Sequence, residues 1–101
     1  MVNNRTKPLI MCIDDAEMTL KILGQLIKNA GCDVITAESG RDALEKVKKT
    51  MPDIILLDIM MPDMDGYQVC SKLQKNDETS YIPVIFVTGL EKEQDKARAF
   101  S

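Results

Sequence analysis

Acidic side chains stand at the ends of two apolar segments of this sequence, where they could bind a cation together. Asp14 and Asp15 directly follow the apolar run that begins at Leu9, and Asp58 ends the segment DIILLD. Carboxylates that lie close together repel one another, and a bound cation or a raised pKa relieves that repulsion. Oxygen ligands with room for water suit Mg²⁺, which usually takes one or two carboxylates together with phosphate oxygens. These residues therefore predict a magnesium site if the fold brings the two segments together.

Each of these positions also has a purely structural interpretation. Asp14 and Asp15 could cap the helix that follows them, because Asp is a favoured N-cap residue. Asp58 could be an ordinary residue of the turn after a strand. Thr88, which Gly89 follows, ends a later apolar segment. Its hydroxyl could hydrogen-bond an anion at the same place or be satisfied within the strand. Each position alone is weak evidence for a functional site, whereas these positions together favour a shared one.

Apolar segments alternate with helical patterns along the whole chain, which places the acidic residues at strand ends. Strands are expected over 9–13, 34–37, 53–58 and 83–87, and helices over 17–30, from Ser39 to before Pro52, over about 65–74 and over 91–100. Such alternation predicts a parallel α/β sheet built from right-handed crossovers. Ligands of open α/β sheets bind beyond the carboxyl ends of the strands. With a strand order of 2-1-3-4, the first and third strands are neighbours and the three carboxylates converge.

Composition and residue usage exclude several other classes of function. The chain has 101 residues, which fits one domain. It has no histidine, which excludes Ser-His-Asp and Cys-His catalysis and imidazole ligation. With 13 basic and 16 acidic residues, its charge of -3 argues against a nucleic-acid-binding surface. No segment resembles a signal peptide or approaches the ~20 apolar residues of a membrane span, so a cytoplasmic location is expected.

The cysteines and a short acidic motif do not predict metal sites. Cys12, Cys32 and Cys70 form no C-x-x-C pair, and Cys12 and Cys70 are expected to be small buried apolar residues. The stretch from Asp63 to Gly66 suggests a calcium loop, but aligning its glycine with the sixth loop position puts a lysine at the twelfth, where a bidentate glutamate is required. Asp65 is instead predicted to be a helix N-cap, with Gly66 permitting a tight turn.

Three motifs and their spacing carry a family resemblance. They are IMCIDDAEM, LLDIMMPDMDGYQVC and PVIFVTGL, which together extend from about Lys7 to Ser101. With them the chain resembles the receiver domain of two-component response regulators. The resemblance implies a doubly wound parallel sheet of the flavodoxin-like receiver fold, with strand order 2-1-3-4-5.

The resemblance also implies a role for each residue of the acidic site. Asp58 is then the phosphoacceptor, which takes a phosphoryl group from the histidine of a partner kinase. Asp15 binds Mg²⁺ directly, Asp14 acts mainly through water, and the Met60 backbone carbonyl completes the protein ligands. The phosphoryl transfer depends on positioning and on charge neutralisation by the metal ion.

Further expectations concern the switch and the partners. Thr88 is implied to contact the phosphoryl oxygen as the switch hydroxyl, and Gly89 to leave space and offer its backbone N–H. The implied partners are a sensor histidine kinase or a phosphotransfer protein, and an output domain or target protein. The chain would be a signalling module that assists its own phosphorylation, and not an enzyme.

The sequence departs from the family pattern at its C-terminal end. Receivers of this family continue into a fifth strand, which ends with a lysine that pairs with the phosphoryl group, and into a last helix. This sequence stops at Ser101, before both, and Lys92 and Lys96 fall in the helix just after Thr88, so neither replaces that lysine. We therefore expect residues 1–101 to be a single, C-terminally truncated receiver domain. Its strand over 84–87 would then be an exposed edge that promotes self-association.

Two other functions remain open from the sequence. A degenerate or truncated receiver could act as an interaction module without phosphorylation. A Mg²⁺-dependent phosphatase with an aspartyl-phosphate intermediate would require a D-x-D pair directly at a strand end. The one such pair here, Asp63 and Asp65, lies in the loop after Asp58, which argues against that class.

Overall fold

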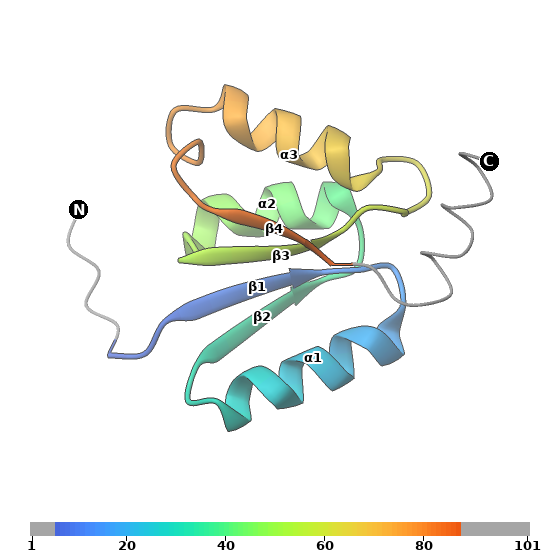
Figure 1. The fold of residues 1–101 in the computed structure, drawn as a ribbon. Coiled ribbons are helices and arrows are strands. Elements are labelled where there is room, and N and C mark those ends of the chain that lie inside the picture. Colours follow the sequence, from blue (N-terminus) through green and yellow to red (C-terminus); the bar gives the residue numbers. More distant parts are fainter. Residues whose placement is uncertain (1–5, 88–101) are drawn as a thin grey trace.

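The computed structural model describes residues 6–87, whose strands all run parallel in one sheet (Figure 1). In chain order the elements are β1 (Leu9–Ile13), α1 (Glu17–Asn29), β2 (Asp33–Ala37), α2 (Gly40–Thr50), β3 (Ile54–Asp58), α3 (Gly66–Lys75) and β4 (Val84–Val87). The strand order is β2-β1-β3-β4, as predicted. Thr88, Gly89 and the helix expected over 91–100 lie outside the described residues.

Helices cover both faces of the sheet, which makes the fold doubly wound (Figure 1). On one face, the strand residues Met11, Ile13, Ile55 and Leu57 pack in a buried cluster with side chains of α2 and α3. On the other face, Cys12 packs with side chains of α1. This alternation follows from the two-residue period of a strand. β3 is therefore a central strand covered on both sides, which agrees with its wholly apolar interior.

Local signals set the helix ends much as the sequence predicted. Asp65 caps α3 in a reciprocal capping box: the Gln68 N–H donates to Asp65 Oδ1 over 2.8 Å, and the Asp65 N–H donates to Gln68 Oε1 over 2.9 Å. Gly31 follows α1 with a φ of 88°, a left-handed conformation that glycine adopts without cost. Met51 ends α2 in the same region, with a φ of 48°, which no sequence signal had indicated.

The described helices are all too short or too polar to cross a membrane. The three cysteines are free thiols. Cys12 is fully buried, as predicted, whereas Cys70 is only half-buried and packs at the margin of the core.

The burial of Cys12 should make its thiol inert. Loss of hydration raises the pKa of this thiol to about 11, so at pH 8 only about one molecule in a thousand carries the reactive thiolate. We expect a thiol reagent at pH 8 to modify Cys32 and Cys70 in the native protein, and Cys12 only after denaturation. Peptide mapping by mass spectrometry measures this order. Equal labelling rates at all three thiols would contradict the buried position of Cys12.

Candidate functional site

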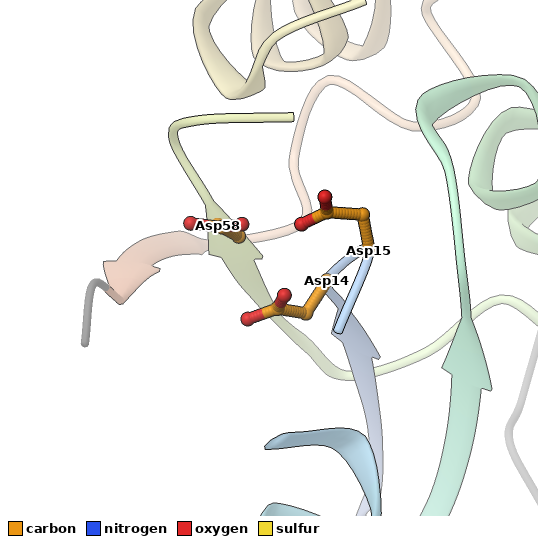
Figure 2. Close-up of side chains that lie close together, drawn as sticks. All are labelled: Asp14, Asp15 and Asp58. Carbon is orange, nitrogen blue, oxygen red and sulfur yellow. The ribbon is translucent and has the colours of Figure 1, made fainter. Parts of the chain in front are cut away.

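The pairing of β1 with β3 places the acidic residues at one edge of the sheet. Ile13 is the register partner of Leu57, so the next residues along the two strands, Asp14 and Asp58, lie side by side where the strands end. Asp15 follows in the loop that leads to α1. One carboxylate oxygen from each of the three residues lies within 4.8 Å of the other two. Figure 2 shows the three side chains around a common space. The predicted convergence is therefore found.

The three carboxylates differ in their contact with solvent. Asp58 is only 1% exposed and Asp14 6% exposed, whereas Asp15 is exposed. The site is thus closed on the side of the sheet and open beside Asp15. Asp15 is therefore the member of the cluster that meets solvent.

Asp14 is held by the backbone around it and does not cap α1. Its N–H donates to the Ala37 carbonyl over 3.1 Å, which extends the pairing of β1 with β2. Its Oδ1 accepts a hydrogen bond from the Ala16 N–H over 2.9 Å. The N-cap of α1 is Ala16, which makes no side-chain cap hydrogen bond. Neither Asp14 nor Asp15 therefore occupies the N-cap position of α1.

The loop after Asp58 is fixed against the end of β3. Ile59 and Met61 are buried, while Met60 between them is partly exposed. The Met60 N–H donates to Asp58 Oδ1 over a long 3.4 Å, and the Gly66 N–H donates to the Ile59 carbonyl over 2.8 Å. The Met60 N–H thus contacts the Asp58 carboxylate, and the Gly66 N–H joins the start of α3 to the loop. Coordination by the Met60 carbonyl stays a prediction.

Gly66 has a different role from the one predicted for it. A Cβ at this position would collide with the Asp58 carbonyl oxygen and lie 2.9 Å from the Ile59 Cα. Gly66 is therefore required because α3 begins against the backbone of the phosphoacceptor candidate, and not because a turn needs an unusual φ. A sequence signal cannot separate these two uses of glycine, since the contact joins segments that only the fold brings together.

The other acidic residues of this loop take no part in the cluster. Asp63 is exposed and adopts a φ of 67°, a conformation that Asp tolerates better than most residues. Asp65 caps α3. Among the described residues, the group of side chains that could hold a metal ion is Asp14, Asp15 and Asp58. This agrees with the rejection of a calcium loop over 63–66.

The donors of the cluster suit a hard cation. All three offer carboxylate oxygen, the ligand type of Mg²⁺, Ca²⁺ and Mn²⁺, and none offers sulfur or imidazole nitrogen. Oxygens bound to one Mg²⁺ are separated by up to about 4.2 Å, because each lies roughly 2.1 Å from the ion. Carboxylate oxygens within 4.8 Å of one another could therefore hold one such ion together.

Comparisons with known proteins agree with the motifs. A family model described as the response regulator receiver domain matches residues 10–101. Protein PilG of Pseudomonas aeruginosa is 44% identical over 89 residues, which are 88% of this chain and 66% of PilG. Response regulator PleD of Caulobacter vibrioides is 40% identical over 87 residues, which are 86% of this chain and 19% of PleD. The chain therefore spans less than two thirds of either relative.

Solved structures give the same result for the fold. The chain is similar to the N-terminal domain of a response regulator receiver protein from Methanoculleus marisnigri JR1, with a TM-score of 0.78 and 32% sequence identity. The similarity covers 88% of this chain and 76% of that one.

The steric role of Gly66 can be tested with a matched pair of glycine substitutions. Gly66→Ala should destabilise the protein by about 1–3 kcal/mol, because the new methyl group meets backbone that cannot move aside. Gly24→Ala in the interior of α1 should instead stabilise it by about 0.5–1 kcal/mol, since its Cβ would meet only Val34 Cγ1 at 3.8 Å. Urea denaturation measures both. A Gly66→Ala variant as stable as the parent would contradict the close packing of α3 on the strand end.

Proposed function

Because this chain belongs to the response regulator receiver family, we propose that it accepts a phosphoryl group on the carboxylate of Asp58. The observation that carries the proposal is the convergence of Asp14, Asp15 and Asp58 within 4.8 Å at the end of the central strand. Asp58 is the most deeply buried of the three, and its carboxylate is oriented by the Met60 N–H. Residues 1–101 would act as one receiver domain.

The proposal includes a Mg²⁺ ion at the acidic cluster. Asp15 would bind it directly, Asp14 mainly through water, and the Met60 carbonyl would complete the protein ligands. A bound Mg²⁺ would supply the positive charge that offsets the repulsion between the Asp58 carboxylate and an incoming phosphoryl group. Asp15 is exposed, so its carboxylate is accessible to an ion from solvent.

The transfer step needs little covalent chemistry from the protein. A carboxylate oxygen of Asp58 would attack the phosphorus of a phosphohistidine on the partner, forming a P–O bond as the P–N bond breaks. The histidine ring leaves with the electron pair and takes up a proton. What this chain supplies is a buried, oriented carboxylate at the end of a rigid strand, which holds the nucleophile in line.

The switch would lie beside the phosphoacceptor. Val87, the last residue of β4, is the register partner of Asp58. Thr88 and Gly89 are the next two residues in the sequence. We assign the Thr88 hydroxyl to the new phosphoryl oxygen and the Gly89 N–H to the same group. Their movement would bias a two-state surface of the domain.

Receiver domains are signalling modules, and the proposed partners follow from that role. A sensor histidine kinase or a phosphotransfer protein would donate the phosphoryl group, and an output domain or target protein would read the switched state. We assign this chain a signalling role and not an enzymatic one. A cytoplasmic location is supported by the three free thiols, which suit a reducing compartment.

Phosphorylation of Asp58 is tested by intact-mass measurement. With Mg²⁺ and a small phosphodonor such as acetyl phosphate, the protein should gain the mass of one phosphoryl group. Asp58→Asn should abolish the gain, because the amide is not a nucleophile under these conditions. Asp63→Asn is the matched control: it removes the same charge from an exposed loop position outside the cluster and should leave the gain intact.

The role of the metal ion is read from the same experiment. Removal of Mg²⁺ with a chelator should prevent the mass gain, and Asp15→Asn should raise the Mg²⁺ concentration needed for it by about tenfold. If the folded full-length protein shows no gain with Mg²⁺ present, the phosphoacceptor proposal is wrong. The chain would then be the second candidate, an interaction module that keeps the acidic cluster without phosphorylation.

The edge of the sheet supports a further proposal, that two copies of the chain associate through β4. Among the described residues β4 pairs only with β3. Ile85 is 51% exposed and Phe86 39% exposed, so both faces of this strand present apolar surface. Phe86 also meets the ring of Tyr67, with their centroids 5.2 Å apart. An edge strand with such side chains is a template for pairing with another chain.

Light scattering at high concentration measures this association. The protein should show a mass above that of the monomer, and Ile85→Lys should restore the monomer, because a charge on an edge strand opposes pairing. Ile22→Lys, which makes the same change at an exposed position on α1, should have no effect. A monomeric parent protein, or equal effects of both substitutions, would contradict the proposal.

A further inference from the structure

A shallow groove of about 440 Å³ runs between α2 and α3, which lie side by side on the same face of the sheet (Figure 1). Its lining combines positive charge with apolar surface. The residues are Arg41, Leu44, Glu45, Lys48, Lys49, Met64 and Lys72. Leu44 and Met64 are half-buried and pack against the core, so they form an apolar floor, and the charged side chains are exposed around them.

The charge of this groove is opposite to that of the whole chain. Four of its side chains are cationic and one is acidic, whereas the chain carries a net charge of -3. The ion pairs recorded on the described helices are Lys21 with Glu17 and Lys46 with Asp42, and neither involves a residue of the groove. Like charges gathered around apolar surface favour the binding of an anion there.

The helix dipole explains only part of this arrangement. A cation in the last turn of a helix is favoured by the dipole, which accounts for Lys48, Lys49 and Lys72. Arg41 lies in the first turn of α2, where the dipole disfavours a cation. The dipole also gives no reason for an apolar floor between the cations.

The groove is long enough for a helix. A second hollow of about 270 Å³ adjoins it, shares Leu44, Lys48 and Lys72, and extends to Asn76 and Thr79 at the far end of α3. The lining of the two hollows extends from Met64, before the start of α3, to Asn76, just after its end. The helix between them has ten residues and is therefore about 15 Å long. A partner segment of about three helical turns would span this distance.

We propose that the groove between α2 and α3 binds an acidic amphipathic helix of a partner protein. The apolar stripe of that helix would lie on Leu44 and Met64, and its Asp and Glu side chains would meet Arg41, Lys48 and Lys72. This is the helix-in-groove mode of recognition, with apolar anchors one turn apart. The surface is separate from the acidic cluster, so the proposal stands whether or not Asp58 is phosphorylated.

A designed peptide tests the proposal on the full protein. The probe is a fluorescein-labelled peptide of about four helical turns, with Leu at i, i+3, i+4 and i+7 positions and Glu elsewhere. Its control has the same composition in an order that breaks the apolar stripe. Fluorescence anisotropy should show saturable binding of the probe, at least tenfold tighter than that of the control peptide.

Charge reversals locate the binding surface. Lys48→Glu with Lys72→Glu should weaken binding of the probe at least tenfold. Lys21→Glu with Lys28→Glu makes the same change of charge on α1, where both residues lie at a different hollow, and should leave the affinity nearly unchanged. If the first pair fails to fold by circular dichroism, Lys48→Gln with Lys72→Gln replaces it, with the same direction of effect.

The outcomes separate the proposal from general attraction to anions. Equal losses from the two pairs of substitutions, or equal affinity for the two peptides, would overturn it. Tighter binding to phosphatidylglycerol vesicles or to duplex DNA than to the probe, reduced by the groove substitutions, would also overturn it, because the surface would then recognise a membrane or a nucleic acid.

Discussion

The parallel pairing of β1 with β3 is the constraint on which both the core and the acidic site depend. Ile13 is the register partner of Leu57, and this register places Asp14 beside Asp58. A slip of one residue would turn each buried side chain of the moved strand to the opposite face and would part the two carboxylates. Since Met11, Ile13, Ile55 and Leu57 are all buried in one cluster, the hydrophobic effect stabilises this register. The geometry of the site is thus maintained by residues that take no part in its chemistry.

A second constraint acts on the loop between β3 and α3. The capping box at Asp65 fixes the start of α3, and Gly66 allows that start to press against the backbone of Asp58. The buried side chains of Ile59 and Met61 anchor the same loop. The loop that follows Asp58 is therefore held at both of its ends, and this would favour the precise positioning that the proposed phosphoryl transfer requires.

The features that the sequence predicted are those with a local signal or a family motif. The cap at Asp65 follows from a residue type at a helix start, whereas the strand order was implied by the resemblance to receiver domains; the structure confirms both. Met51 adopts a left-handed backbone conformation that its residue type does not indicate. Gly66 is required by a contact with a segment that is distant in the sequence, which no local pattern indicates. The groove was not predicted for the same reason: Arg41 and Lys72 are far apart in the sequence and become neighbours only when α2 and α3 pack together.

The loop after Asp58 also connects the acidic site with the groove between α2 and α3. One end of the loop, at Gly66, touches the Asp58 backbone. Met64, two residues earlier, lines the groove and lies against Gly40 of α2, where even a methyl group would meet its sulfur at 2.8 Å. A phosphoryl group that shifts this loop would therefore change the floor of the groove. By thermodynamic linkage, a helix bound in the groove would then change the equilibrium of phosphorylation at Asp58 by the same factor that phosphorylation changes its affinity.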